Sequence, residues 1–145
     1  MEEVAFRSYP FLKLNKVFGL RITQVIIAVS FALYHIIQGW GFQIAFLGPG
    51  IWAFIFGLAA VWSKGIAVPT GIHMALNLIQ QLVGMKSGDS ESIWLLTLPE
   101  NISDAAMAQA ETWGIITQLL VLAAAIICIE IYIRKNNSPK NISEI

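Results

Sequence analysis

The chain has 145 residues, of which 57% are hydrophobic and only 12% are charged, about half the charged fraction of a typical soluble domain. Nine basic and nine acidic residues cancel, so the net charge offers no attraction to nucleic acid, and we expect none as a partner. Cys128 is the only cysteine, which excludes a disulfide framework or a cysteine-based zinc ribbon within one chain.

Long apolar stretches separate the charged residues. No Asp, Glu, Lys or Arg occurs between Arg21 and Lys64 or between Glu111 and Glu130. The hydrocarbon core of a bilayer requires roughly 20 apolar residues per helix, and a soluble domain of this size could not bury so much apolar surface. The sequence therefore predicts an integral membrane protein.

The residues before the first apolar stretch are predicted to form an N-terminal helical segment at the membrane interface. Glu3 and Arg7 are four residues apart and share one face of a helix. Ser8, Tyr9 and Pro10 then break or kink this helix. Further basic residues favour an interfacial position, namely Lys13, Lys16 and Arg21.

Four apolar segments are predicted to span the membrane as helices, because a helix satisfies its own backbone polar groups in lipid. The second segment is interrupted early by Gly48, Pro49 and Gly50, which predicts a kink, and Pro69 lies in the first turn of the third. The predicted fold class is an all-α, multi-pass transmembrane helix bundle. Its spans cover residues 22–38, 44–62, 66–83 and 114–133.

The basic residues predict the orientation of this bundle. With four spans, eight of the nine basic residues fall on one side, and only Lys86 falls on the other, in an acidic loop over residues 84–113. Because basic residues favour the cytoplasmic side of a membrane, we expect both termini to be cytoplasmic. Trp40, Trp62 and Trp113 fall near the predicted interfaces, as in an aromatic belt.

The two histidines of the chain both lie inside predicted spans. Counted from the basic flanks, His35 lies roughly 20 Å deep and His73 roughly 13 Å, and ionisable side chains at such depth indicate function. Asn77 is four residues after His73, on the same helix face. The alternative is that each histidine bonds a neighbouring helix and only fixes packing. Glu130 is four residues before Arg134, and an ion pair between them explains it.

Three short motifs occur in order along the chain: Glu2-Glu3-Val4-Ala5-Phe6-Arg7, Phe31-Ala32-Leu33-Tyr34-His35 and His73-Met74-Ala75-Leu76-Asn77. The set resembles the motifs E-E-x-x-x-R, F-x-x-x-H and H-x-x-x-N/D of the CAAX protease and bacteriocin-processing (CPBP, or Abi) family of intramembrane endopeptidases, which includes the type II CAAX prenyl protease. The resemblance covers residues 2 to about 84. It implies an enzyme that hydrolyses a peptide bond in a membrane-associated protein or peptide.

The resemblance implies two chemical schemes for one set of residues. In the first, Glu2 or Glu3 is the general base, His35 polarises the attacking water, and no cofactor is needed. The remaining residues support this chemistry, with Arg7 orienting a glutamate and with hydrogen bonds to the oxyanion donated by His73 and Asn77.

In the second scheme, Glu3, His35 and His73 bind a zinc ion. Asn77 would be a poor zinc ligand, and the chain has no H-E-x-x-H helix. We therefore slightly favour the scheme without metal, and the sequence leaves both open.

The position of the first motif bears on the domain organisation. In the family, E-E-x-x-x-R lies on a transmembrane helix that further spans precede, whereas here it begins at Glu2. We expect residues 1–145 to form a single membrane domain that is the C-terminal catalytic part of a larger bundle. A longer chain or a partner would supply the preceding helices, and the expected location is the plasma membrane of a bacterium.

The expected partners are the lipid bilayer and a peptide or protein substrate. A prenylated C-terminal tail, a leader peptide and a membrane-protein loop all suit a cavity between helices. Two other functions remain open. One is a non-catalytic membrane partner of the same fold, such as a bacteriocin-immunity protein, and the other is a transporter or channel subunit, which would also bury polar residues.

Overall fold

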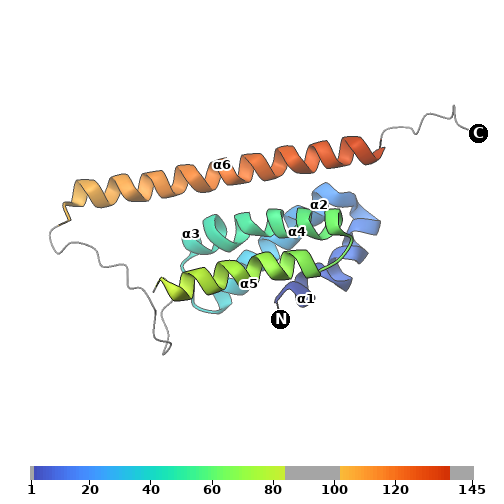
Figure 1. Ribbon diagram of the computed structural model, residues 1–145, viewed down its shortest axis with the longest axis horizontal. Coiled ribbons are helices and arrows are strands. Elements are labelled where there is room, and N and C mark those ends of the chain that lie inside the picture. The colour runs from blue at the N-terminus through green and yellow to red at the C-terminus, as the bar shows by residue number, and fades with distance from the viewer. Residues whose placement is uncertain (1, 84–101, 138–145) are drawn as a thin grey trace, which may run out of the picture.

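The computed structural model describes residues 2–83 and 102–137, and every regular element in this part of the chain is a helix, which confirms the predicted all-α class. Figure 1 shows α6 lying along one side of the other helices. The elements are α1 (Glu2–Arg7), α2 (Tyr9–Ile37), α3 (Phe42–Ala45), the π-helical turn η1 (Phe46–Gly50), α4 (Ile51–Ser63), α5 (Ala67–Leu82) and α6 (Asp104–Asn137).

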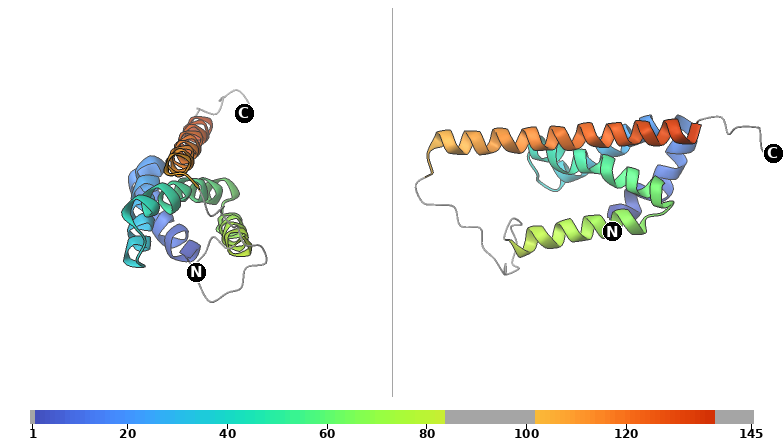
Figure 2. Two further views of the ribbon diagram at one scale, coloured as in Figure 1. Left: turned by 90° about the vertical axis from the view of Figure 1, so that its left-hand side faces the viewer. Right: turned by 45° about the horizontal axis from the view of Figure 1, so that its top comes forward.

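The first 37 residues form a helical hairpin rather than one long helix. Gly19 has φ 74° and ψ 169°, a conformation outside the helical region. A straight helix would hold residues 6 and 31 about 37 Å apart, yet the rings of Phe6 and Phe31 lie 5.1 Å apart. The chain therefore reverses at Gly19, and the left view of Figure 2 shows the N-terminal residues running alongside the second half of α2.

This hairpin corrects the prediction of an interfacial N-terminal segment. Ser8 does separate α1 from α2, as expected. However, Glu3, Arg7 and Phe11 are all nearly inaccessible to solvent, so this face of the segment belongs to the interior of the bundle. The sequence argument failed because it read Arg7 as a surface charge, whereas the arginine is buried with Glu3 as its partner.

The predicted break in the second span is the turn η1. Pro49 lies inside it, and a proline lacks the amide hydrogen that an α-helical turn would use. The turn also brings two backbones together, because a Cβ atom at Gly50 would lie 3.3 Å from the Cβ of Ala32. The core then forms between α2 and α4, around Ala28, Phe31, Ala53 and Phe56.

Three stretches of the described chain are long and apolar enough to cross a membrane: Glu2–Ile37, which contains the reversal at Gly19, Phe42–Ser63 and Asp104–Asn136. The third predicted span corresponds to α5, which has 16 residues and a buried Pro69 in its first turn. Its length of about 24 Å is less than the roughly 30 Å of hydrocarbon that a helix must cross. It packs mainly against α4.

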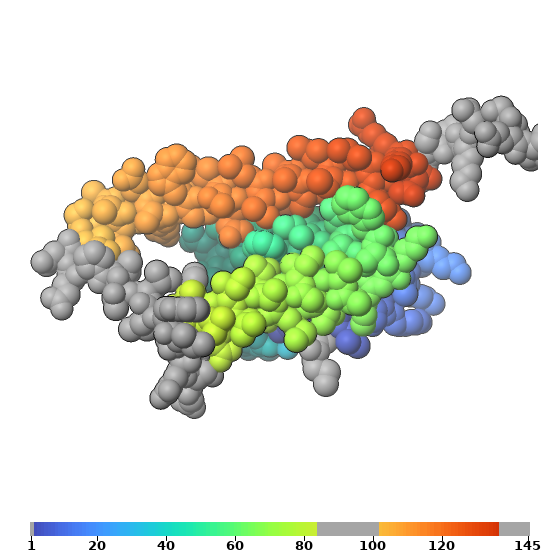
Figure 3. Space-filling view, viewed as in Figure 1, coloured from blue at the N-terminus to red at the C-terminus, as the bar shows by residue number. Residues whose placement is uncertain are grey.

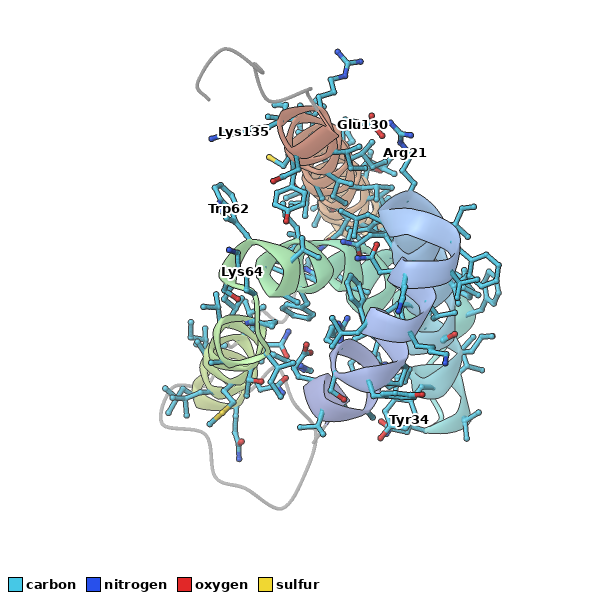
Figure 4. The ribbon with its side chains drawn as sticks, turned by 90° about the vertical axis from the view of Figure 1, so that its right-hand side faces the viewer. Arg21, Tyr34, Trp62, Lys64, Glu130 and Lys135 are labelled. Atoms are coloured by element: carbon cyan, nitrogen blue, oxygen red, sulfur yellow. The ribbon has the colours of Figure 1, made fainter. Side chains whose placement is uncertain are left out.

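The last helix, α6, packs on α4 and is attached at its C-terminal half. Tyr132 Oη donates a hydrogen bond to the carbonyl oxygen of Val61 at 3.3 Å. Arg21 holds Glu130 with two hydrogen bonds of 2.5 and 2.8 Å, and Figure 4 shows the two side chains meeting. The prediction that Glu130 pairs with Arg134 was therefore wrong. Glu130 instead forms a bidentate ion pair with Arg21 of the neighbouring helix α2.

Arg21, Lys64 and Lys135, which Figure 4 labels, lie toward the end of the bundle at the right of Figure 1, which we call the basic end. Arg7 does not belong to this end, so the sequence count of basic residues on one side included one buried residue. Lys86, Lys140 and most of the predicted acidic loop lie outside the described residues.

Candidate active site

The carboxylate of Glu3 joins two motifs that are far apart in the sequence. Its Oε1 accepts a hydrogen bond from His73 Nδ1 at 2.8 Å and another from Arg7 Nη1 at 2.9 Å. Glu3 and Arg7 are one turn apart in α1, and His73 lies in the middle of α5. The structure therefore brings the first and third motifs into direct contact.

The two glutamates differ in their surroundings. The Oε2 atom of Glu2 lies 3.5 Å from His73 Nε2, so the two carboxylates approach the two ring nitrogens of one imidazole. The side chain of Glu3 is 4% exposed and that of Glu2 is 27% exposed. Glu3 is thus buried between two partners, whereas Glu2 remains accessible.

Arg7 is buried among aromatic rings. A charge in such a position is costly unless it is paired, and here Glu3 supplies the negative charge. The guanidinium carbon also lies 4.4 Å from the ring centre of Phe31 and 5.1 Å from that of Phe56. These ring faces attract a cation, so Arg7 fixes Glu3 from a position that water hardly reaches.

His35, in the second half of α2, has a defined ring orientation. Its Nδ1 lies 2.8 Å from the carbonyl oxygen of Phe31. Because a carbonyl oxygen can only accept, Nδ1 carries the hydrogen, and the neutral ring keeps a lone pair on Nε2. The ring also packs edge-to-face against Phe31 and Trp40, at centroid distances of 4.7 and 5.1 Å.

Both histidines contact the same ring, that of Phe31, and both line one cavity of about 350 Å³ together with Asn77. A second cavity of about 280 Å³ is lined by Glu2 and Glu3. His73 and Asn77 line both cavities and thus form the wall between them. All six residues that the sequence singled out therefore meet in one region of the bundle.

The metal scheme would need Glu3, His35 and His73 to surround one ion. Among residues 2–83 and 102–137, no three His, Cys, Asp or Glu side chains gather closely enough to hold a metal. Glu3 is directed to His73 and Arg7, and His35 Nδ1 is directed to a backbone carbonyl. The donor set of the zinc scheme is thus not assembled in this arrangement, and we derive no step through a metal.

Two residues of the site were missed by the sequence analysis. Phe56 of α4 stacks on His73 with a centroid distance of 5.0 Å and an interplanar angle of 14°, and no motif marks it. Gln118 of α6 lines the larger cavity, and its Oε1 atom is buried without a hydrogen-bond partner among the described residues. The only available signal was a polar amide in an otherwise apolar run.

Known proteins provide an independent comparison. Residues 1–79 match the family described as type II CAAX prenyl endopeptidase Rce1-like. The membrane-embedded CAAX protease MroQ of Staphylococcus aureus (strain USA300) is 41% identical over 83 residues, which are 53% of this chain and 32% of that protein. The chain thus spans about a third of the length of this curated relative. No solved structure matches the chain.

Proposed function

Because the chain belongs to the Rce1-like family of type II CAAX prenyl endopeptidases, we propose that it is an intramembrane endopeptidase that hydrolyses a peptide bond of a membrane-associated substrate. The observation that carries this proposal is the hydrogen bond between Glu3 and His73. It joins the E-E-x-x-x-R and H-x-x-x-N motifs beside a wall that two cavities share. Packing alone would not require both histidines and both glutamates at these cavities.

Glu2 is the proposed general base, because it is the more accessible of the two carboxylates. It takes a proton from a water molecule, whose oxygen then attacks the scissile carbonyl carbon. His35 lines the other cavity, beyond the wall of His73 and Asn77, so the lone pair on its Nε2 is assigned a hydrogen bond from an N–H of the substrate peptide. Breakage of the C–N bond returns the proton from Glu2 to the leaving amine, so that the proton count balances.

His73 and Asn77 are the proposed donors to the oxyanion that forms on the carbonyl, since both lie in the shared wall. Glu3 accepts a hydrogen bond from His73 Nδ1, so donation to the oxyanion from Nε2 requires that both ring nitrogens carry a hydrogen. Glu3 and Arg7 are therefore positioning residues that act through His73.

A prenylated C-terminal tail is the substrate that we favour over a leader peptide or a membrane-protein loop. The family takes its description from prenyl substrates, and apolar side chains of the larger cavity suit a lipidated segment. These side chains are Ile44, Trp52 and Leu76. The proposed location is the plasma membrane of a bacterium, with the basic end on the cytoplasmic side.

The test is cleavage by the full chain reconstituted in liposomes. The probes are a quenched fluorescent peptide that ends in a farnesylated cysteine and three further residues, and the same peptide without the farnesyl group. Glu2→Gln keeps the shape of the side chain and removes the base, so the cleavage rate should fall about 10²–10⁴-fold. Asn77→Ala should lower kcat roughly 10²–10³-fold with little change in KM.

Glu111→Gln is the matched control, because Glu111 is exposed on α6 and lies away from both cavities. It should cleave at the wild-type rate. Undiminished cleavage by Glu2→Gln would refute the assignment of the base, and failure of the folded wild-type chain to cleave either probe would refute the function. Prolonged treatment with a chelator should leave the rate unchanged, whereas loss of cleavage that zinc restores would favour the metal scheme.

A further inference from the structure

A groove of about 450 Å³ lies between α4 and α6 at the basic end, and we call it the basic-end groove. It runs along α4 from Leu58 to Lys64, the residue that follows the helix, and along α6 from Cys128 to Asn136. It shares no lining residue with the two cavities of the candidate active site. Its ligand is therefore expected to be a molecule other than the peptide substrate.

The lining of the groove changes from apolar to charged along its length. Leu58 and Cys128 lie at the inner part, and Lys64 and Lys135 lie at the rim. At 1.5 Å per residue, each helix covers about 10 Å between these levels. Both helices show the same gradient, which matches a ligand with an apolar body and a charged head.

The charge of the rim is positive and is not neutralised by the described part of the chain. Among the ion pairs of residues 2–83 and 102–137, none involves Lys64 or Lys135. Arg21, by contrast, is paired with Glu130 on the opposite side of α6 from Lys135, as Figure 4 shows. The two lysines of the groove are thus available to an anion.

Lys64 occupies a backbone position that glycine would adopt more easily. It ends α4 with φ 56° in the left-handed region, and its N–H bonds the carbonyl oxygen of Ala60. A side chain other than glycine or asparagine is uncommon there. Figure 4 places Trp62 between Lys64 and Lys135, and Trp62 is 72% exposed, as expected for a ring at headgroup level.

We propose that the basic-end groove binds an anionic phospholipid, with its phosphate between Lys64 and Lys135 and the upper part of an acyl chain against Leu58, Val61 and Ile131. Basic pockets between membrane helices recognise such headgroups. A volume of about 450 Å³ lies in the range of small-molecule sites. The apolar inner part distinguishes this ligand from a free phosphate, which has nothing to place there.

The test is native mass spectrometry of the full chain in detergent, titrated with dioleoyl-phosphatidylglycerol or dioleoyl-phosphatidylcholine. One lysine near an anionic headgroup contributes about 1 kcal/mol, or roughly five-fold in affinity for the lipid. The two lysines together should therefore favour phosphatidylglycerol over phosphatidylcholine about 30-fold. The double variant Lys64→Gln/Lys135→Gln should lose this preference. Ile131→Trp should fill the groove and weaken the binding of phosphatidylglycerol, whereas Ile126→Trp, elsewhere on α6, should not.

Lys13→Gln/Lys16→Gln removes the same charge from exposed positions outside the groove and should retain the preference. An equal loss in this control would show diffuse electrostatic attraction and would overturn the proposal. Equal affinity of the wild-type chain for the two lipids would also overturn it. Glycerol phosphate, which has the headgroup chemistry without acyl chains, should not compete; full competition would assign the groove to a free phosphate instead.

Discussion

Gln24 and Gly57 illustrate how closely single residues of α2 and α4 are matched. Gln24 is 1% exposed, and an ideal Cβ atom at Gly57 would lie 2.1 Å from its Oε1 and 2.7 Å from its Cδ. Glycine at position 57 is therefore what allows the Gln24 amide to lie against the backbone of α4. No other described glycine has so close a neighbour.

Gly57→Ala should lower the free energy of unfolding by about 1–3 kcal/mol, because the buried amide of Gln24 must move within a packed core. The measurement is denaturant-induced unfolding in detergent micelles. Gly71→Ala is the control, since a Cβ atom there meets no other atom within 4 Å. In the Gln24→Ala background the cost of Gly57→Ala should disappear, and full additivity of the two changes would contradict this explanation.

At the residue scale, the chemistry of the site could be predicted from the sequence, but its supports could not. His73 and Asn77 stand out because a polar residue in an apolar stretch is conspicuous and its spacing sets the helix face, whereas Glu3 was identified only through the resemblance of its motif to that of the family. Phe56 and Gly57 have ordinary neighbours in the sequence. Phe56 matters because it stacks on His73 of α5, and Gly57 because Gln24 of α2 lies against it. The sequence of α4 alone does not show which helices it packs against.

Gly19 determines the course of the chain at the scale of secondary-structure elements. Without the reversal there, residues 2–37 would form one helix of about 54 Å, and Glu3 could not reach His73. A Cβ atom at Gly19 would have open space around it. Any cost of a side chain at this position therefore comes from the backbone conformation alone.

Gly19→Ala should destabilise the protein by about 1–3 kcal/mol, because φ 74° with ψ 169° is a region that essentially only glycine adopts. Cleavage should fall as well if the strained hairpin opens and separates Glu3 from His73. Gly41→Ala is matched to it, since that glycine also has open space but a negative φ of −61°. Thermal unfolding of the two variants in detergent compares them, and equal midpoints would argue against strain at Gly19.

The elements themselves were predictable where their signals are local. The break at Ser8 and the irregular turn at Gly48 to Gly50 follow from prolines and glycines, and both occur. The reversal at Gly19 was missed because one glycine among apolar residues is also compatible with a continuous helix. The pairing of Glu130 with Arg21 was missed because it depends on which helices are neighbours.

At the scale of the whole molecule, orientation decides from which side a substrate reaches the site. The larger cavity is lined by Trp40, after α2, and by Gln80, near the end of α5. Both lie at the end opposite to the basic end. If the basic end is cytoplasmic, as we propose, this cavity lies in the half of the bundle away from the cytoplasm.

Cysteine labelling tests this orientation. In a Cys128→Ala background, Ala105→Cys at the start of α6 should react with a membrane-impermeant maleimide in intact cells. Gly65→Cys, at the basic end and with open space around it, should react only after permeabilisation, because basic residues favour the cytoplasmic side. The reverse pattern would invert the orientation, and labelling of both from one side would contradict the arrangement of α6.

The low burial of α6 has a consequence for protein engineering. Residues 1–79, which contain all six residues of the proposed chemistry, end within α5, while α6 adds Gln118 to the wall of the larger cavity. Figure 3 shows α6 as a separate ridge along the molecule. Within its most apolar 18 residues, only 11% are buried. Positions around Gln118 can thus be redesigned to reshape the wall of the larger cavity, while Glu130 and Tyr132 keep the helix attached and the Glu3–His73 hydrogen bond is left intact.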